Sequence, residues 1–354
     1  MLKSFTEMYP KAPLYTLLYD PSLAKKFFTD VKIIGSFLQN NRLARRYFKW
    51  FLPFMPTAVE SFNLKGYDVV LSDSSAFSKG VITDTNAVHI CYCHTPTRYL
   101  WSDSWEYIVE LQSAKSYNPL KSAQNMCLKK FLPLLLTYLR IWDYHTAERV
   151  DHFIANSNFV ANRIKKFYHR DSVVIYPPVE TDAYKLVPEK KNYFVVVSRL
   201  RPYKRVDLAI DAFNEMRLPL KIIGGGWEIK YLRKKANKNI EFLGEILDIG
   251  IKNKIIGEAR ALLHPQEEDF GIAAVEAAAC GTPVIAYGKG GVLETVVEGK
   301  TGKFFEEQTW ECLADTVLHF KDNEFNYAAI KDHAAQFSEE RFKREIKQFI
   351  ESNV

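Results

Sequence analysis

Short apolar runs alternate with longer amphipathic segments along most of this chain of 354 residues. The runs end at glycine or polar residues and are rich in valine and isoleucine, which predicts buried strands, and the segments between them carry apolar residues at helical spacing. This alternation is typical of doubly wound parallel sheets, so we predict an α/β protein. The expected strands are 67–72, 87–92, 151–156, 173–176, 193–198, 219–223, 240–243, 260–264 and 283–286. The expected helices are 123–148, 157–168, 205–216, 227–236, 249–258, 271–280 and 339–351.

A proline pair, Pro177-Pro178, interrupts the pattern near the middle of the chain and predicts a domain junction. The length also exceeds one typical hydrophobic core. We therefore expect two Rossmann-like domains, at residues 1–178 and 179–335. Residues 336–354 are expected to form a C-terminal helix that packs back toward the first domain.

The beginning of the chain differs from the usual start of a doubly wound domain, which is a strand, a glycine-rich loop and a helix. Residues 2–10 read instead as the end of a helix. We therefore expect the first domain to lack its first strand and the glycine-rich loop that faces phosphate.

Composition is that of a globular protein, with 47% hydrophobic and 25% charged residues. No apolar run approaches the roughly 18 residues of a spanning helix, and no signal peptide is recognisable. The five cysteines are odd in number and irregularly spaced, which predicts a cytoplasmic location. Cys91, Cys93 and His94 have no second ligand pair at zinc spacing, so no metal is expected.

The net charge of +6 lies entirely in the first part of the chain. Residues 1–150 hold 18 Lys and Arg against 12 Asp and Glu, whereas residues 151–354 hold 30 of each. The aromatic and basic segment 42–52 would suit an anionic membrane surface, such as the inner face of the cytoplasmic membrane. An amphipathic surface helix explains it equally well. Nucleic acid is not expected, because no recognised binding motif accompanies this modest excess.

The segment 264–287 carries the clearest chemical signal. It reads as a strand end, an acidic loop, an alanine-rich helix and the next strand. Glu268 falls in the loop and Glu276 on the helix. The helix start at Gly271–Ala273 presents unpaired amides and the positive end of the dipole, which together form an anion site. With acceptors on either side, this arrangement fits a sugar attached to a phosphate.

Other strand ends carry weaker signals. Arg199 and Lys204 would flank a diphosphate at a helix start, although a solvated basic loop is the usual explanation of such residues. Gly224 and Gly225 would let a ligand approach the backbone closely, but a plain structural turn is the more usual explanation of such glycines taken alone. They do not match the dinucleotide fingerprint, because Ile229 stands where its third glycine should be.

Two further strand ends complete the candidate site. Gly244 and Glu245 could offer main-chain groups to a nucleotide base. His94 follows the strand 87–92, and a lone histidine at such a position is more often a hydrogen-bonded structural residue.

Taken together, the chain resembles a family 4 glycosyltransferase of the GT-B fold, in the mannosyltransferase-like branch of surface polysaccharide assembly. The expected missing first strand and loop are a departure from that family. The segments that carry the resemblance are Cys91–Trp101, Ala155-Asn156-Ser157, Ser198-Arg199-Leu200, Lys204–Asp207, Gly224-Gly225-Gly226, Phe242-Leu243-Gly244, Glu268–Glu276 and Gly288–Gly291.

The resemblance implies two Rossmann-like domains that face a central cleft, and a retaining transfer that needs no metal. It implies that Arg199 and Lys204 bind the donor diphosphate, that Glu268 contacts the transferred sugar, that Glu276 holds the ribose and that His94 lies beside the acceptor. The donor-binding residues so implied are Gly224, Gly225, Gly244, Glu245, Asp269, Phe270, Gly271, Ile272, Ala273 and Glu276.

The expected donor is GDP-mannose, followed by UDP-sugars, and the expected acceptor is a lipid-linked sugar or oligosaccharide. An inactive protein that binds a nucleotide sugar remains the alternative, because the missing loop would help to enclose the donor. A nicotinamide oxidoreductase shares the layout but lacks the three-glycine fingerprint and its acidic partner.

Overall fold

A computed structural model describes residues 1–105 and 119–354, with side chains at all of these except residue 49 and residues 119–130. The chain divides into two compact units. The first comprises residues 1–175 and 345–354, and the second comprises residues 176–344. The last helix, α15 (Glu339–Asn353), therefore contributes residues to both units.

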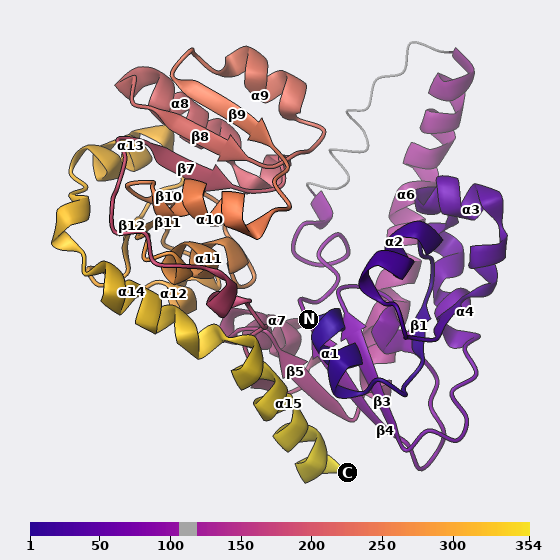
Figure 1. The fold of residues 1–354 in the computed structure, drawn as a ribbon. Helices are drawn as coiled ribbons and strands as arrows, with labels where there is room; N and C mark the ends of the chain where they lie inside the picture. The colour runs from indigo at the N-terminus through magenta and orange to yellow at the C-terminus, as the bar shows by residue number, and fades with distance from the viewer. Residues whose placement is uncertain (106–118) are drawn as a thin grey trace. The chain divides into compact units, whose positions relative to one another are not determined.

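The second unit is built on a six-stranded sheet of order β12-β11-β10-β7-β8-β9, in which every pairing is parallel. α8 packs beside both α9 and α13 (Figure 1). The strands are β7 (Phe194–Val197), β8 (Leu220–Ile223), β9 (Ile240–Gly244), β10 (Leu262–His264), β11 (Val284–Tyr287) and β12 (Gly302–Phe305). The helices are α8 (Val206–Met216), α9 (Ile229–Lys235), α10 (Ile249–Gly257), α11 (Ile272–Ala279), α12 (Val292–Thr295), α13 (Trp310–Leu318) and α14 (Tyr327–Ala334).

The strand order reverses between β7 and β10. From β7 the chain continues to β8 and β9 on one side, then returns to build β10, β11 and β12 on the other. In open α/β sheets a crevice forms at the carboxyl ends of the strands at this point, because the two connections leave in opposite directions. The loops after β7 and β10 are therefore where a ligand of the second unit is expected.

The strands β7 and β11 are buried and apolar, as is usual for the inner strands of a parallel sheet. All four residues of β11 are buried, and so are three of the four in β7. α11 packs tightly because five of its eight residues are alanine, and Ala274, Ala277 and Ala279 are at most 1% exposed.

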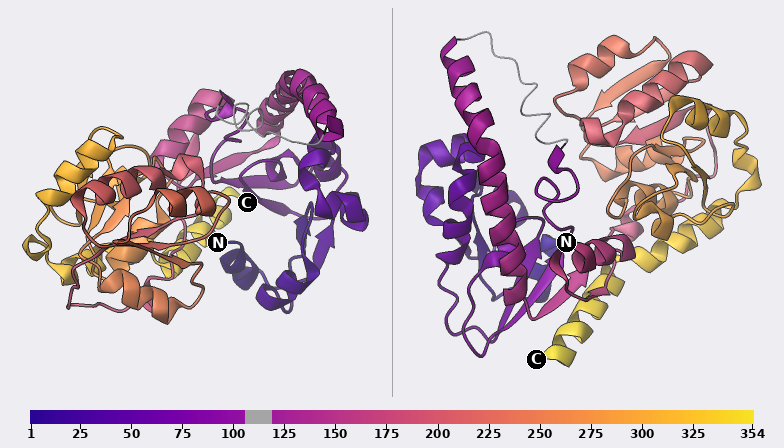
Figure 2. Two further views of the ribbon diagram at one scale, coloured as in Figure 1. Left: turned by 90° about the horizontal axis from the view of Figure 1, so that it is seen from above. Right: turned by 180° about the vertical axis from the view of Figure 1, so that it is seen from behind.

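The first unit contains a four-stranded parallel sheet of order β3-β4-β5-β6 and a separate parallel pair, β1-β2. Its longest helix, α6, is continuous in both views of Figure 2. The strands are β1 (Leu14–Thr16), β2 (Ile33–Gly35), β3 (Val69–Ser74), β4 (Val88–Cys93), β5 (His152–Ala155) and β6 (Ser172–Val174). The helices are α1 (Leu2–Met8), α2 (Pro21–Phe27), α3 (Arg42–Arg46), α4 (Met55–Glu60), α6 (Pro119–Thr146) and α7 (Asn158–Tyr168), with a 3-10 helix η2 at Phe48–Phe54.

The predicted α/β class and the two doubly wound sheets are confirmed. Every strand expected from the apolar pattern is present within about two residues, and so are the expected helices of both halves, apart from a four-residue difference at the start of α6. The pattern did not predict β1, β2, β12, α13 or α14.

Candidate active site

The candidate site of the second unit lies in the loops after β7 and β10, on either side of the reversal in strand order. Lys204 ends a short 3-10 turn after β7, and Glu268 lies in the loop after β10. Their side chains form an ion pair, with only 12% of Lys204 and 19% of Glu268 exposed. The fold thus brings two predicted site residues, 64 positions apart, into contact.

The backbone at Glu268 is held by the loop after β11. The carbonyl oxygen of Glu268 accepts a hydrogen bond of 2.7 Å from the amide of Gly291, and Glu268 forms a β-bridge with Gly290. A side chain at residue 291 would come within 2.2 Å of the Asp269 carbonyl oxygen, so the two loops pack backbone against backbone. The position of Glu268 is therefore fixed by main-chain contacts.

α11 begins at Ile272, directly after this loop. Gly271 precedes it with a φ of +97°, a conformation that side chains with a Cβ rarely adopt, and no side chain caps the helix. Phe270 anchors the turn by packing against Tyr176 and Phe337, with ring centroids 5.6 and 5.5 Å away. First-turn amides have no intrahelical partner, so this start is suited to an anion beside Glu268.

Two buried residues beneath the helix start were not predicted from the sequence. The Nε2 atom of His264 and the Oε1 atom of Gln266 are buried without a hydrogen-bond partner among the described residues. A Cβ at residue 271 would lie 3.7 Å from His264 Nε2, so this ring lies beside the turn. Burial lowers the pKa of His264 to about 4, which keeps the imidazole neutral. The signal that identifies these two residues is a buried polar atom without a hydrogen-bond partner, and only the structure reveals it.

Glu276 lies on α11 and is held by two partners. Its carboxylate accepts a 2.6 Å hydrogen bond from Lys252 of α10, and only 15% of its side chain is exposed. Tyr184 also approaches it, and burial together with the Glu276 charge raises the pKa of the Tyr184 hydroxyl well above its usual value. Lys252 and Tyr184 thus orient the Glu276 carboxylate.

The glycine loop after β8 packs directly against the loop after β7. Gly224 has a φ of +138°, and a Cβ there would lie 1.8 Å from the carbonyl oxygen of Ser198. The Gly224 amide also donates a 2.7 Å hydrogen bond to the carbonyl oxygen of Gly244. A Cβ at Gly225 would meet the Glu245 carboxylate at 2.5 Å. The predicted residues after β8 and β9 therefore lie together at one edge of the sheet.

Arg199 is exposed in the loop after β7, directly before the buried Leu200. Its neighbour Arg205 is occupied elsewhere, because it contacts Asp207 and donates to Gln308 at 3.2 Å. Arg201 lies over the ring of Trp227. Arg199 and Lys204 lie on this same loop, and the Lys204 side chain contacts Glu268.

In the first unit, His94 lies at the carboxyl end of β4. Its Nε2 atom is 2.5 Å from Asp73 Oδ1 at the end of β3, and both side chains are partly exposed. Asp73 was not predicted as a site residue. Its carboxylate fixes the orientation of the imidazole.

The loop that follows His94 is held by a buried carboxylate on α6. Asp143 accepts hydrogen bonds from Thr97 and Trp101 in this loop, at 2.8 and 2.7 Å, and from Tyr168 of α7 at 2.8 Å. Lys79, which is 1% exposed, supplies the opposite charge at 2.5 Å. This network fixes the loop after β4 and is structural.

The neighbours of His94 are poor metal ligands. Cys91 and Cys93 lie in the hydrophobic core of the first unit, and burial raises the pKa of the Cys91 thiol to about 12. A thiol must lose its proton to bind zinc. Within residues 1–105 and 119–354, no group of three or more His, Cys, Asp or Glu side chains is arranged to hold a metal ion.

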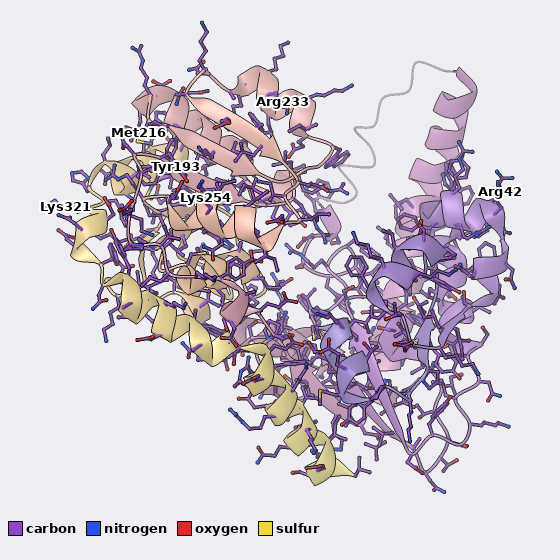
Figure 3. The ribbon with its side chains drawn as sticks, in the orientation of Figure 1. Arg42, Tyr193, Met216, Arg233, Lys254 and Lys321 are labelled. Carbon is purple, nitrogen blue, oxygen red and sulfur yellow. The ribbon has the colours of Figure 1, made fainter. Side chains whose placement is uncertain are left out.

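The aromatic and basic segment 42–52 is not one amphipathic helix, so that interpretation is wrong. It divides into α3 and η2, separated by Tyr47. Arg42 points outward from α3 (Figure 3), while Leu43 and Trp50 are 61% and 54% exposed. Among the helices that the structure describes, none combines the length and hydropathy needed to cross a bilayer.

Comparisons with known proteins agree with this geometry. Residues 14–183 match the model of Glycosyltransferase Family 4, and residues 180–344 match that of Glycosyl transferases group 1. An uncharacterised glycosyltransferase of Methanocaldococcus jannaschii is 28% identical over 193 residues, which are 53% of this chain and 54% of that protein. The alpha-1,3/1,6-mannosyltransferase alg2 of Schizosaccharomyces pombe is 24% identical over 290 residues, covering 68% of this chain and 52% of its own length.

Among solved structures, Anabaena HepE in complex with UDP-glucose is similar in fold. The TM-score is 0.68 at 18% identity, over 99% of this chain and 94% of that one. The chain spans about half the length of the curated relatives it matches. The two family models together account for residues 14–344, so the chain belongs to glycosyltransferase family 4 and has the GT-B fold.

Proposed function

We propose that this protein transfers a hexose from a nucleoside diphosphate sugar, with retention of anomeric configuration and without a metal. The observation that supports this best is the contact between Lys204 and Glu268 beside the start of α11. Such a donor has two parts: a diphosphate, which needs positive charge, and a sugar, which needs hydrogen-bond acceptors. Lys204 and the start of α11 would serve the diphosphate, and the Glu268 carboxylate would serve the sugar.

In this proposal Lys204 and Arg199 bind the diphosphate together with the first amides of α11. A diphosphate that draws Lys204 toward it leaves the Glu268 carboxylate to accept hydrogen bonds from sugar hydroxyls. Charge that develops on the departing phosphate is then stabilised by groups that are already in place. Glu276, oriented by Lys252 and Tyr184, would hold the ribose.

The transfer itself needs no protein nucleophile. The bond between the anomeric carbon and the β-phosphate oxygen breaks, and the acceptor oxygen bonds to that carbon on the same face. The acceptor proton passes to an oxygen of the leaving phosphate. His94, oriented by Asp73, would lie beside the acceptor and stabilise negative charge there.

We propose GDP-mannose as the donor, because the alg2 relative is a mannosyltransferase. UDP-hexoses come second, since a protein of similar fold binds UDP-glucose. The exposed aromatic and basic side chains of 42–54 suit the headgroups of an anionic membrane, where a lipid-linked sugar acceptor would be presented. The site of action in this proposal is the cytoplasmic face of that membrane.

The direct test incubates the protein with a panel of GDP- and UDP-sugars and lipid-linked acceptors, with and without EDTA. We expect one donor to be consumed at a rate that EDTA leaves unchanged, and proton NMR to show that the product keeps the anomeric configuration of the donor. An inverted product or full dependence on a divalent cation would contradict the mechanism.

A nucleotide-sugar binder without transfer activity is the second candidate. It is favoured by the interrupted sheet of the first unit, in which β1 and β3 do not pair beside Asp73 and His94. The same panel separates the two, because a binder gains thermal stability with its nucleotide sugar yet forms no product.

A further inference from the structure

A cavity of about 1530 Å³ lies within the first unit. Most of the residues that line it are aliphatic or aromatic, and they include residues of α1, α2, β1, β3 and the segment 42–64. The volume exceeds the roughly 300–1,000 Å³ of pockets that bind ordinary small molecules. The cavity is therefore suited to a large ligand that is mainly apolar.

The apolar wall at β3 is incompletely covered. Val69, Val70 and Leu71 line the cavity and are only partly buried. Ile90 and Cys91 on the neighbouring strand β4, by contrast, are fully buried. Hydrocarbon placed against partly exposed apolar side chains removes their surface from water, which is favourable in proportion to the area covered. This wall is therefore suited to the hydrocarbon chain of a lipid.

Two cations stand at the mouth of the cavity. Arg45 and Arg46, in the last turn of α3, line the cavity and are also exposed to solvent. Among residues 1–105 and 119–354, no carboxylate pairs with either guanidinium group. The two carboxylates that line the cavity, those of Asp20 and Asp73, are already hydrogen-bonded. The arginines are thus available to a phosphate group, whose oxygens match the fork of N–H donors on a guanidinium.

The basic mouth lies at one end of the apolar wall. Ala44, beside Arg45 on α3, belongs to one hydrophobic cluster with Phe77, which follows β3. The arginines therefore stand near the carboxyl end of this strand. Leu64, which precedes β3, also lines the cavity, so the apolar wall extends along the strand away from the arginines. Such a cavity matches an amphiphile that has a charged headgroup and a hydrocarbon chain.

Apolar side chains also surround the mouth. Leu23 and Phe27 of α2 line the cavity and are each 58% exposed. Phe48 of η2 lines it too and is 53% exposed. Apolar and basic side chains exposed at one opening suit the interface of a bilayer, so a lipid chain would enter the cavity from a membrane surface.

We propose that this cavity binds the hydrocarbon chain of a lipid phosphate and that Arg45 and Arg46 bind its phosphate group. The phosphate then lies at the carboxyl end of β3, where Asp73 lines the same cavity and its carboxylate is 2.5 Å from His94 Nε2. This inference rests on the proposed function in one respect, because a sugar attached to the phosphate would reach His94 and serve as the acceptor. The binding of the lipid itself does not depend on transfer.

The test measures by calorimetry the affinity of the protein for dodecyl phosphate, below its micelle concentration and without a sugar donor. Two further probes are inorganic phosphate, which lacks the chain, and dodecyl maltoside, which lacks the charge. Arg45→Gln/Arg46→Gln removes the two cations from the exposed last turn of α3. The matched control, Arg233→Gln/Lys234→Gln, removes two exposed cations from the last turn of α9.

We expect dodecyl phosphate to bind the wild type and the control equally, and the Arg45→Gln/Arg46→Gln variant at least tenfold more weakly. Inorganic phosphate and dodecyl maltoside should each bind the wild type at least tenfold more weakly than dodecyl phosphate does. Hydrogen exchange at the amides of residues 14–18 and 69–73, which line the cavity, locates the ligand. Dodecyl phosphate should slow this exchange at least fivefold.

An absence of binding, or unchanged exchange at these amides, would overturn the proposal. Equal affinity for the wild type and the Arg45→Gln/Arg46→Gln variant, or equal affinity for dodecyl maltoside, would show that the arginines bind no phosphate. Equal affinity for inorganic phosphate would show that the chain is not bound. No measurement uses a sugar donor, so failure of the proposed transfer would leave lipid binding standing, and failure of lipid binding would leave the donor site of the second unit untouched.

Discussion

At the scale of single residues, a substitution at Glu268, which contacts Lys204, allows nucleotide binding to be distinguished from sugar transfer. Glu268→Gln keeps the shape of the side chain and removes its charge. The variant should bind a nucleoside diphosphate as well as the wild type or better, because Lys204 no longer has a competing anion. Transfer should fall at least a hundredfold, because the sugar loses its charged acceptor.

Calorimetry with the nucleoside diphosphate and a transfer assay measure the two effects. Glu241→Gln is the matched control, since it removes the carboxylate of an exposed pair with Lys221, 3.8 Å away on neighbouring strands. Full transfer activity in Glu268→Gln would remove this residue from the mechanism.

A second prediction at this scale concerns the buried side chain of His264 and the pH dependence of stability. Its pKa of about 4 lies below the ordinary value of 6.5, so the unfolded chain binds more protons between these values. The free energy of unfolding should therefore fall as the pH drops from 6.5 to 4, by up to about 3 kcal/mol from this residue. His264→Gln should reduce that loss, as measured by urea unfolding at pH 4.5 and 7. The matched control, His319→Gln, replaces a side chain that is 78% exposed, and an equal reduction there would refute the assignment.

The sequence revealed the charged site residues better than the buried polar ones. Glu268 and Lys204 stand out because charge next to a strand end is conspicuous. His264 ends the strand β10 and Gln266 lies in the loop after it, and the lack of hydrogen-bond partners at both can be recognised only from three-dimensional packing. The pairing of Glu276 with Lys252 was also hidden, since it joins two helices 24 positions apart.

At the scale of elements, the start of α11 depends on one glycine. Gly271→Ala places a Cβ at a φ of +97°, where the cost is roughly 1–2 kcal/mol. No backbone clash accompanies it, because the nearest atoms lie at 3.7 Å. We expect a modest loss of thermal stability and weaker nucleotide binding as the first turn shifts. Gly250→Ala in α10 is the control, because that glycine has no positive φ, and the account fails if both variants behave alike.

The loop after β4 depends on a different element, the end of α6. Asp143→Asn removes the charge that compensates buried Lys79, which should cost roughly 3–5 kcal/mol in the free energy of unfolding. The control Asp315→Asn changes a side chain that is 74% exposed on α13. Chemical denaturation of both variants tests this, and a loss below about 1 kcal/mol in Asp143→Asn would show that the network contributes little.

Strands buried on both faces were predictable because a run such as Phe194–Val197 has few other interpretations. β12 (Gly302–Phe305) was missed because it starts with glycine and lysine, which are unfavourable in a strand until a neighbour covers it. A single amphipathic helix was one of two interpretations of the segment 42–52, because its apolar spacing is helical. Instead Tyr47 separates a short α-helix, α3, from a 3-10 helix, η2.

At the scale of the whole molecule, the pattern predicted two doubly wound units but not the order of their strands. Which strand lies beside β7 depends on long-range packing, and that order places the loops of Lys204 and Glu268 side by side. Among the described strands, β1 and β3 lie in separate sheets. The contact between the hydroxyls of Tyr15 and Tyr67 could not be read from the sequence.

The central claim is that the loops of the second unit bind the diphosphate of a sugar donor through Lys204 and Arg199. Calorimetric titration of GDP and UDP into the wild type and into Arg199→Ala/Lys204→Met tests it most directly, with Lys221→Met as the control. The account predicts that one nucleotide binds the wild type and the control equally, and binds the double variant at least a hundredfold more weakly. Equal affinity for all three proteins would contradict it.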